Sequence, residues 1–331
     1  MDVVDLSMLD LPTLARQAGD TRTRAVDLFA GWGGFTAGAT AAGVNVVWAA
    51  NHWRLAVEAH AQNHPDTAHS CQDLSADTDF SRLPDFDLLL ASPACQGHSQ
   101  AAQPSRARSD RARRHHDKLR ATALAVIGCA DLCEPKAIVV ENVLDFRRWR
   151  LYPGWCDMLR EIGYTIQELV VRASHLDVPQ RRDRLFVVAT KRGEAIQLPK
   201  REEPPIGPCI DWDDPEPWWY PVRDATEAVK GRIAKGRRRC GTRFLSQHVT
   251  GHPGVHLDEP MRTITTKDQW IAVDGRYYRP LTVREYARGM GFADDYGWPP
   301  SASRKQCIAG LGNAVPPPVA REVVTRVQEV M

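Results

Sequence analysis

Several common signals are missing from this sequence of 331 residues. No apolar run reaches the roughly 18 residues that a membrane-spanning helix needs, so we expect no contact with a membrane. The first residues, MDVVDLSMLD, are acidic and lack the basic segment of a secretory signal. The eight cysteines form no CxxC pair, which argues against zinc and is typical of reduced thiols in a cytosol. We therefore expect a cytoplasmic protein without a bound metal.

Two familiar phosphate-binding patterns, GxGxxG and GxxxxGKS/T, are also absent. Their absence argues against a dinucleotide site of the usual kind and against a P-loop. The chain instead has DLFAGWGGFTAG, residues 27–38, as a glycine-rich turn between an apolar strand and a helix. Gly31, Gly33 and Gly34 would let the backbone approach a ligand closely, and the start of the helix offers free N–H groups.

The net charge of +2 says little, but the distribution of charge is informative. Residues 106–120 carry seven Lys or Arg against two Asp, and residues 230–243 (KGRIAKGRRRCGTR) carry seven and no acid. Two separate basic segments in a near-neutral chain favour contact with a polyanion. Each segment alone is equally compatible with a solvated surface.

Apolar runs alternate with helical patterns between residues 24 and 190. Such alternation is typical of an α/β fold, a doubly wound and mostly parallel sheet covered on both faces. After Thr190 the composition shifts to Pro, Trp and acids, so we expect a smaller, irregular, β-rich region there. Strands are expected at 24–31, 44–51, 86–93, 136–143, 165–173 and 184–190, and helices at 34–43, 53–64, 120–133, 152–164, 282–291 and from 316 onward.

Polar and aromatic side chains follow several of these strands. Trp53 (in ANHW) follows the second strand, and Asp73 (in CQDL) closes a probable third. Ligands of open α/β sheets lie at the carboxyl ends of strands, so these positions suit a nucleoside-bearing cofactor. Core packing is the alternative for Trp53.

A second group of residues suggests chemistry at the same rim. Cys95 lies in SPACQGHS, just past a strand, and Glu141 lies in VVENV at the end of another. Gln180, Arg182 and Arg184 lie in VPQRRDRLFVVA, where the two arginines would share one face of an extended segment. Taken singly, Cys95 could be a small buried hydrophobe and the others surface charges. Together they bring a nucleophile, an acid and two anion-binding groups to one edge.

Six motifs in order give the chain a family resemblance. They are DLFAGxGG, CQGxS, ENV, QRRxR, RPLTVREYARGMGF (residues 279–292) and GNAVPPPVA (residues 312–320). The chain resembles the DNA (cytosine-5) methyltransferases, which use S-adenosylmethionine to methylate a base flipped out of duplex DNA. The resemblance runs from Arg24 to Ala320, apart from a variable stretch at about 191–279.

The resemblance implies an organisation into parts. It implies an N-terminal appendage at 1–21 and a catalytic, S-adenosylmethionine-binding domain of the Rossmann-like class at 22–190. A target-recognition domain would follow at 191–302, and a C-terminal helical segment at 303–331 would return to the catalytic domain.

The resemblance also implies a catalytic role for four residues. Cys95 would add to C6 of cytosine, which makes C5 nucleophilic, and Glu141 would assist at N3. Arg184 would contact O2 and support the nucleophile, while Arg182 would help to hold this architecture together. The residue that removes the C5 proton is not identified, and water could serve.

Binding residues follow by the same resemblance. Flipping a base out of the duplex costs a few kcal/mol. In the family a basic loop after the nucleophile contacts the phosphates and fills the vacated space, and the resemblance implies this role for the basic loop after Cys95. The cofactor positions are Phe29, Gly31, Gly33, Gly34, His52, Trp53, Asp73 and Asn313. The DNA positions are Pro93, whose carbonyl would accept from the cytosine amine, and Gln96, Ser99, Arg106, Arg108, Gln180, Arg237, Arg238, Arg239 and Arg243.

Two departures from the family pattern stand out. The proline usual before the nucleophile is Ala94 here, which frees a backbone angle and adds an N–H, so we expect a looser loop with no local restraint. The acid usual before the tryptophan is His52, so either Asn51 or His52 would bind the ribose more weakly. A non-standard methyl donor is a further reading of that change.

Other functions stay open at this point. One branch of the family methylates tRNA cytosine, but the long variable stretch with its basic segment favours double-stranded DNA. A catalytically silent DNA-binding paralogue is disfavoured, since Cys95, Glu141, Arg182 and Arg184 are all retained. Adenine-N6 methylation would need a DPPY-like motif, which is absent. We expect a bacterial or phage-encoded, nucleoid-associated monomer, with its recognition sequence and its role in restriction, phage protection or regulation undetermined.

Overall fold

A computed structural model describes residues 21–94, 122–213, 218–249 and 251–331. Within these residues the contacts divide the chain into two compact units. Unit 1 is formed by the chain up to Val171, by Asp183–Leu198 and by Val319–Met331. Unit 2 is formed by Arg172–Arg182 and Pro199–Pro318, and each unit is described by itself.

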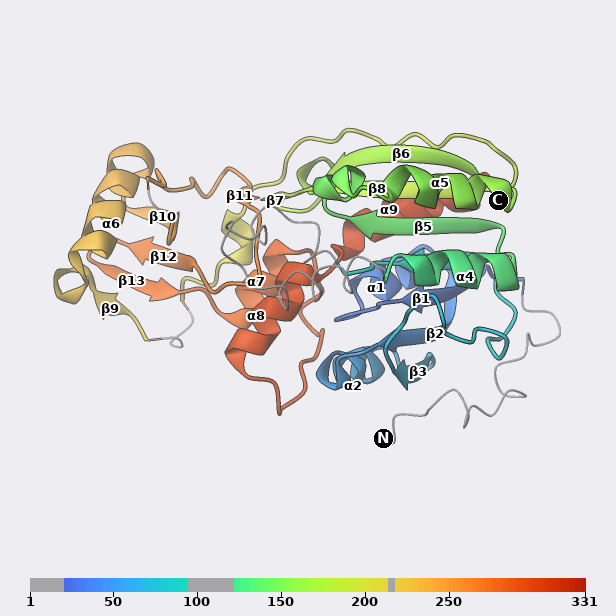
Figure 1. The fold of residues 1–331 in the computed structure, drawn as a ribbon. Coiled ribbons are helices and arrows are strands. Elements are labelled where there is room, and N and C mark those ends of the chain that lie inside the picture. Colours follow the sequence, from blue (N-terminus) through green and yellow to red (C-terminus); the bar gives the residue numbers. More distant parts are fainter. Residues whose placement is uncertain (1–20, 95–121, 214–217, 250) are drawn as a thin grey trace. The chain divides into compact units, whose positions relative to one another are not determined.

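Unit 1 is built on a seven-stranded sheet in the order β3-β2-β1-β4-β5-β8-β6 (Figure 1). The five strands from β3 to β5 are parallel, and β8 runs antiparallel to β5. The central strands are apolar and fully buried, as strands covered on both faces must be. The strands are β1 (Arg24–Leu28), β2 (Asn45–Asn51), β3 (Ala68–Cys71), β4 (Leu88–Ala91), β5 (Ala137–Asn142), β6 (Thr165–Arg172) and β8 (Asp183–Thr190).

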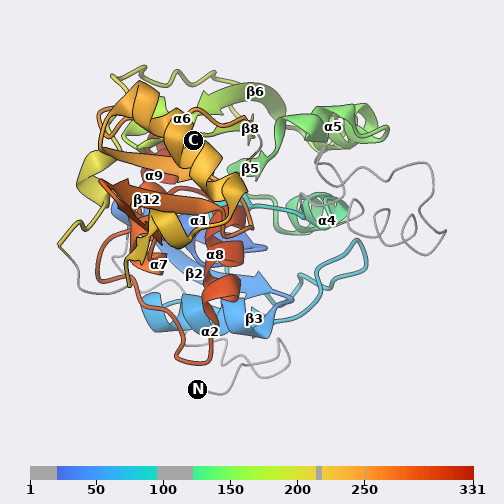
Figure 2. The ribbon, with the colours of Figure 1, turned by 90° about the vertical axis from the view of Figure 1, so that its left-hand side faces the viewer.

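Helices cover both faces of this sheet. They are α1 (Gly34–Ala41), α2 (Arg54–Asn63), α4 (Leu124–Cys133), α5 (Tyr152–Glu161) and α9 (Pro317–Gln328). Figure 2 shows α4 and α5 on one side of the sheet and α1 and α9 on the other. The helix α5 buries Trp155 and Leu159, one turn apart, against the core. The predicted α/β class is confirmed.

The antiparallel strand β8 is a feature that the apolar pattern did not predict. A buried strand reads the same in either direction, so its sequence cannot indicate which way it runs. Because β8 runs against β5, its first residues lie at the edge where the parallel strands end. This reversal brings the start of β8 to the same rim as the end of β5.

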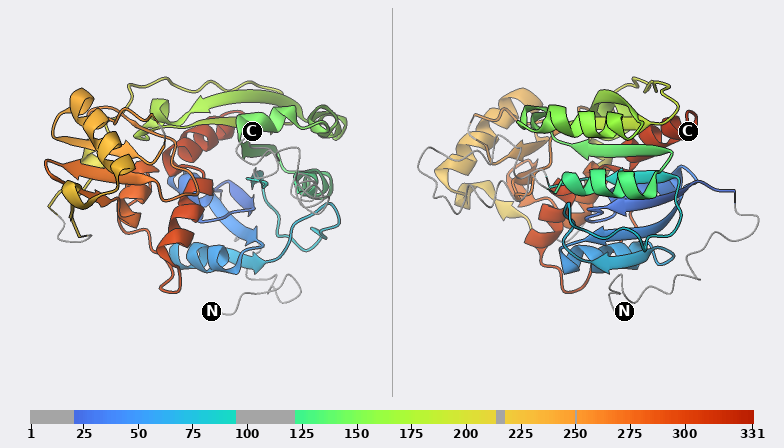
Figure 3. Two further views of the ribbon diagram at one scale, coloured as in Figure 1. Left: turned by 60° about the vertical axis from the view of Figure 1, so that its left-hand side comes forward. Right: turned by 45° about the vertical axis from the view of Figure 1, so that its right-hand side comes forward.

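Unit 2 contains a four-stranded sheet in the order β10-β12-β13-β9 and a short parallel pair of β7 with β11, as labelled in Figure 1. Figure 3 shows the ribbon of this region, in yellow to orange, from two further directions. The neighbouring strands of the larger sheet pair antiparallel. The strands are β7 (Gln180–Arg181), β9 (Tyr220–Pro221), β10 (Arg243–Gln247), β11 (Met261–Arg262), β12 (Trp270–Asp274) and β13 (Tyr277–Pro280). The helices are α6 (Glu227–Cys240), α7 (Val283–Gly289) and α8 (Arg304–Asn313).

The second basic segment forms most of α6, whereas the region was expected to hold loops and short strands. Its few apolar residues fall on one side, and Ile233 is buried against Phe244, Ile271 and Val273 of the sheet. Gly236 lies directly over the Phe244 ring, where no side chain would fit. The helix therefore forms because a narrow apolar stripe finds a sheet to cover, which is a tertiary effect.

The contact boundaries differ from the predicted ones in two places. Residues 172–182 belong to unit 2, although the prediction ran the first domain continuously to 190. Residues 303–318 also belong to unit 2, although the prediction placed a C-terminal segment from 303 with the catalytic domain. In both places side chains of the segment bond to unit 2, as Gln180 does to Gly289. The division by function stays a prediction.

None of the helices within the described ranges is both long enough and apolar enough to cross a membrane.

Candidate active site

The predicted site residues of unit 1 follow consecutive parallel strands. Phe29 follows β1, Trp53 follows β2, Asp73 follows β3, Pro93 follows β4, and Glu141 lies in β5 itself. Parallel neighbours end at the same edge, so all five residues lie along one rim of the sheet. The expectation from strand ends is met for this group.

Glu141 and Arg184 form a direct contact at this rim. Arg184 Nε lies 3.1 Å from Glu141 Oε1, and both side chains are largely buried. The register explains the contact, because Glu141 pairs with Phe186 across the strands. Arg184 is two residues before Phe186, so it lies on the same face as Glu141 and diagonal to it. Burial of this charge pair keeps the carboxyl group in one orientation.

Asn142, the next residue of β5, holds the end of β4. Its Nδ2 donates to the Pro93 carbonyl at 3.0 Å, and its Oδ1 accepts from the Val143 backbone N–H at 2.9 Å. A carbonyl oxygen has two lone pairs, so the Pro93 carbonyl keeps one for a second donor. Asn142 belongs to the ENV motif that was recognised in the sequence, but its contact with the Pro93 carbonyl was not predicted.

The Ala94 N–H has a partner that the sequence did not indicate. It donates to the Thr122 hydroxyl at 3.3 Å, which ties the chain before residue 95 to the chain after residue 121. The partner lies 28 residues away in sequence, so the sequence could not indicate it. The looser loop expected from Ala94 stays a prediction. Cys95, Gln96, Ser99, Arg106 and Arg108 lie outside the described residues.

The glycine-rich turn has an unusual backbone. Phe29 has φ 64°, a left-handed conformation that bulky residues rarely adopt outside functional sites. Gly33 has φ 82° at the residue before α1, where a side chain would be strained. Trp32 is buried and meets Trp53 edge to face, with ring centroids 5.3 Å apart. The glycine-rich turn and Trp53 therefore pack against each other next to the rim of the sheet.

Asn51 and His52 differ in whether the side chain is free to contact a ligand. Asn51 is buried, and its Oδ1 accepts from the Trp53 backbone N–H at 2.9 Å, which engages the side chain at the start of α2. His52 and Asp73 are exposed at the ends of β2 and β3. Of the two residues proposed to replace the usual acid, His52 is therefore the one whose side chain faces solvent.

Gln180 and Arg182 are buried in unit 2 and bind its backbone. Gln180 Nε2 donates to the Gly289 carbonyl at 3.0 Å, and its Oε1 accepts from the Ile264 N–H at 2.8 Å. Arg182 Nη1 donates to the Ile264 carbonyl at 3.0 Å. Its Nη2 donates to the carbonyls of Gly312 and Ala314 at 2.9 and 3.1 Å.

These bonds join the strand pair, the end of α7 and the end of α8 into one body. They also bracket Asn313, a predicted cofactor residue, which is exposed at the end of α8. Arg182 thus makes the kind of contacts that hold a structure together. The described contacts do not bring it to Glu141.

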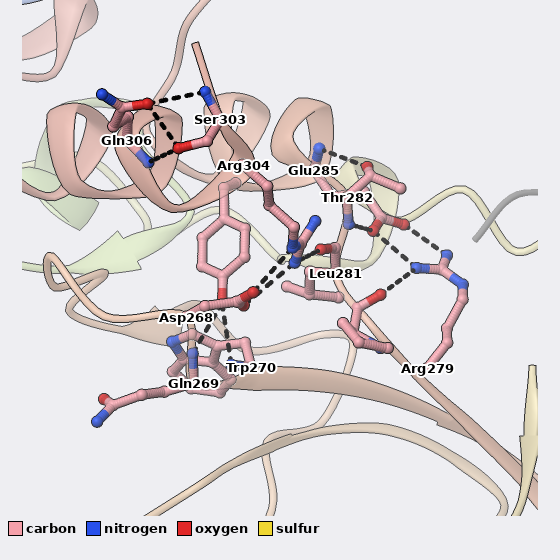
Figure 4. Close-up of polar contacts among 12 residues, drawn as sticks. Asp268, Gln269, Trp270, Arg279, Leu281, Thr282, Glu285, Ser303, Arg304 and Gln306 are labelled. Atoms are coloured by element: carbon pink, nitrogen blue, oxygen red, sulfur yellow. Dashed lines mark hydrogen bonds and ion pairs between the residues drawn. The ribbon is translucent and has the colours of Figure 1, made fainter. Parts of the chain in front are cut away.

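The RPLTVRE motif builds a second buried network in unit 2 (Figure 4). Arg279 donates to both carboxyl oxygens of Glu285 at 2.8 and 2.6 Å, and both side chains are fully buried. Glu285 also completes a capping box with Thr282 at the start of α7. Arg304 in α8 pairs with Asp268, which accepts from the Tyr286 hydroxyl. The motif was recognised in the sequence, but this architectural role was not.

Three of the four predicted arginines of α6 and β10 have protein partners. Arg237 donates to the Gly275 carbonyl, Arg239 pairs with Glu259, and Arg243 pairs with Asp274. Arg238 is exposed, and its side chain has no partner within the described part of the chain. Their contacts with DNA stay a prediction.

No group of three or more His, Cys, Asp or Glu that could hold a metal ion occurs in the part of the chain that the structure describes.

Comparison with known proteins gives a consistent picture. The profile of the family described as C-5 cytosine-specific DNA methylase matches residues 23–211 and 220–329. The chain is 25% identical to the Type II methyltransferase M.HgiDI of Herpetosiphon aurantiacus, over 92% of this chain and 94% of the relative. It is 27% identical to the Type II methyltransferase M.NlaX of Neisseria lactamica, over 92% of this chain and 95% of the relative.

Solved structures share the fold at low sequence identity. The S. pombe Dnmt2 methyltransferase matches with a TM-score of 0.64 at 19% identity, over 93% of this chain and 99% of that one. The Entamoeba histolytica methyltransferase EhMeth matches with a TM-score of 0.67 at 16% identity, over 94% of this chain and all of that one.

Proposed function

Because the chain belongs to the C-5 cytosine-specific DNA methylase family, we propose that it methylates C5 of a cytosine flipped out of double-stranded DNA. The observation that supports this best is the buried contact of Glu141 with Arg184 at the rim where the parallel strands end. The family uses S-adenosylmethionine, which supplies an electrophilic methyl group on a sulfonium sulfur. As relatives of this chain are Type II methyltransferases, we propose a role in restriction-modification.

Residues at the rim fit this cofactor by their chemistry. The glycine-rich turn leaves room beside β1, and a Cβ at Gly31 would meet only the Phe29 carbonyl, at 3.8 Å. Trp53 offers an aromatic face for an adenine ring, and Asp73 offers a carboxylate for its amine. His52 would bind the ribose hydroxyls. Gly33, Gly34 and Asn313 complete the proposed set.

The chemistry begins with the thiol. Cys95 would add to C6 of cytosine as a thiolate, and the electron pair of the C5–C6 bond would become available at C5. Glu141 would hold a proton at N3, where negative charge develops, and Arg184 would fix that carboxyl group and face O2. C5 then takes the methyl group, a base removes the C5 proton, and Cys95 leaves as a thiolate.

DNA binding falls to residues on both units. The Pro93 carbonyl has a lone pair left for the cytosine amine, which thymine lacks. Gln96, Ser99, Arg106 and Arg108 would contact the DNA around the flipped base. In unit 2 we retain Arg238 as the clearest phosphate-binding candidate, because Arg237, Arg239 and Arg243 already have protein partners.

The first test uses the full chain with S-adenosylmethionine and mixed-sequence duplex DNA. Mass spectrometry of the nucleosides should show 5-methylcytosine, and methylation-sensitive sequencing should give the recognition site. Transfer RNA in a parallel reaction should stay unmodified. Formation of N6-methyladenine, or modification of the RNA alone, would contradict the proposal.

The second test changes the carboxyl group. Glu141→Gln keeps the size of the side chain but donates no acidic proton, so we expect methyl transfer to slow by roughly 10²–10⁴-fold. Binding of S-adenosylhomocysteine should persist. Arg181→Gln is the matched control, since Arg181 forms an exposed pair with Glu203. A Glu141→Gln enzyme with the rate of the control would exclude a role at N3.

A trapping experiment addresses the thiol. In DNA with 5-fluorocytosine at the target, C5 carries fluorine in place of the proton that a base must remove, so the adduct cannot be released. We expect a denaturation-resistant protein–DNA complex with the wild type and with Cys240→Ser, and none with Cys95→Ser. A complex that survives in Cys95→Ser would show that another residue attacks C6.

A further inference from the structure

The peptide unit that joins Pro93 to Ala94 has a side-chain partner for each of its polar groups. The Pro93 carbonyl accepts from Asn142 Nδ2 at 3.0 Å, and the Ala94 N–H donates to the Thr122 hydroxyl at 3.3 Å. A trans peptide unit is planar, and its C=O and N–H point in opposite directions. Bonds on both sides of the plane therefore oppose its rotation, which either bond alone would permit.

The two partners are carried by different elements of unit 1. Asn142 is the last residue of β5, and Thr122 lies two residues before the start of α4. The parallel register that pairs Ala91 with Val140 brings Pro93 beside Asn142, two residues further along each chain. The chain that leaves β4 is therefore held both by its neighbouring strand and by the segment before α4.

Thr122 is itself held by contacts with the core of unit 1. Its carbonyl accepts from the Ala125 N–H at 3.1 Å, in the first turn of the helical segment. The next carbonyl, that of Ala123, accepts from the indole N–H of Trp155 at 2.9 Å. Trp155 and Ala123 are both buried. The Thr122 hydroxyl therefore reaches Ala94 from a backbone that is fastened to α4 and α5.

Without the Thr122 bond, the peptide unit could turn. A planar peptide rotates when ψ of the residue before it and φ of the residue after it change in opposite directions. The Pro93 ring fixes φ of residue 93 but not its ψ, and Ala94 has no ring, so neither of these two angles is fixed covalently. Such a rotation would change the direction in which the second lone pair of the Pro93 carbonyl points.

We propose that Thr122 is a positioning residue, whose hydroxyl holds the peptide unit so that the second lone pair of the Pro93 carbonyl points at the amine of the target cytosine. This role rests on the proposed function, in which the carbonyl accepts from that amine. Thr122 supplies by a hydrogen bond the restraint that a proline ring at residue 94 would supply covalently. It lies in none of the six motifs of the family resemblance, so no motif indicated this role.

Methyl transfer is the first test of this bond. Thr122→Val replaces the hydroxyl by a methyl group of similar size, so kcat/KM on duplex DNA with the recognition site should fall roughly three- to tenfold. Thr122→Ser keeps the hydroxyl and should keep the wild-type value. The control is Thr67→Val, which removes a 2.8 Å hydrogen bond to the Val46 carbonyl at the edge where the strands begin, and which should also keep it. A Thr122→Val enzyme as fast as the wild type would overturn the proposal.

A change in the base separates positioning from a general structural role. Duplexes carry either cytosine or 2-pyrimidinone, which lacks the amine, at the target position, and fluorescence anisotropy measures their affinities in the presence of S-adenosylhomocysteine. The cost of flipping each base is the same for every variant, so a change in the ratio of the two affinities reports on the amine contact. Thr122→Val should shift this ratio roughly three- to tenfold toward 2-pyrimidinone, whereas Thr122→Ser and Thr67→Val should keep the wild-type ratio. An equal loss of affinity for both duplexes in Thr122→Val would overturn the proposal.

Ala94→Pro provides a background in which the bond cannot form. It removes the N–H that donates to Thr122 and fixes φ of residue 94. Adding Thr122→Val there should leave the ratio of affinities unchanged, and this measurement requires no catalysis. A shift as large as that in the Ala94 protein would show that Thr122 acts through another group, and would overturn the proposal. The proposed function would be refuted separately, by a wild type that forms no 5-methylcytosine in duplex DNA.

Discussion

At the residue scale, the contact of Glu141 with Arg184 depends on a pairing register. A shift of β8 by one residue would turn Arg184 to the other face of the sheet. The buried Leu185, Phe186 and Val187 oppose such a shift, because it would exchange the two faces of the strand. The apolar residues of β8 therefore fix a polar contact at its start.

The availability of His52 leads to a prediction at the same scale. His52→Glu should bind S-adenosylmethionine more tightly, by roughly three- to tenfold, because a carboxylate accepts more strongly from ribose hydroxyls than a neutral imidazole does. Calorimetry would measure the change, with His52→Gln as the neutral control. Equal affinity of the Glu and Gln variants would mean that residue 52 does not touch the ribose.

At the scale of elements, α6 packs one side on the sheet of unit 2 and carries arginines on its other sides. Its apolar side is narrow and lies on β10 and β12, while its arginines either pair within unit 2 or face solvent. Two glycines in the helix have opposite surroundings. Gly231 has open space around it, and Gly236 lies against the Phe244 ring.

These glycines give a matched pair of variants in one helix. Gly231→Ala should stabilise the protein by about 0.5–1 kcal/mol, because alanine restricts the unfolded chain and favours helix. Gly236→Ala should destabilise it by about 1–3 kcal/mol, because the new methyl group overlaps Phe244. Urea unfolding monitored by circular dichroism would measure both. Similar effects of the two changes would show that α6 does not pack on the sheet as described.

At the scale of the whole molecule, stability should depend on pH through histidines in both units. Burial lowers the pKa of His252 in unit 2 from 6.5 to about 4. Burial lowers the pKa values of His64 and His69 from 6.5 to about 4, and that of His60 well below 6.5. Between pH 6.5 and about 4 the unfolded chain binds protons that the native state does not. Stability should therefore fall as the pH drops through this range.

A comparison of variants checks this assignment. Urea midpoints measured between pH 8 and pH 4 should fall on the acid side, and His69→Gln should reduce the slope. His256→Gln, in unit 2, is measured alongside as a change outside the cluster. Asp27 opposes the trend, since its raised pKa lowers stability as the pH rises toward about 7. An acid slope unaffected by His69→Gln would contradict the assignment.

Much of this organisation could be predicted from sequence, for an identifiable reason. The runs LLLA in β4 and AIVV in β5 are apolar, and polar residues such as Ser92 and Glu141 follow them, so both the strands and the rim could be predicted. The direction of β8, the helix α6 and the Thr122 contact of Ala94 were not, because each depends on residues far apart in the chain. The contacts of His60 with Thr36 and His69 were missed for the same reason, as these three residues lie in α1, α2 and β3.

The buried guanidinium of Arg182 has one further consequence. Arginine stays charged at every pH a protein survives, and its planar group reaches three carbonyls that one lysine ammonium could not match in geometry. The three bonds of Arg182 in unit 2 are thus insensitive to pH, whereas the contacts of His60 with Thr36 and His69 in unit 1 involve rings that gain protons in acid. Acid should therefore leave the Arg182 bonds of unit 2 intact while it charges His64 and His69 of unit 1.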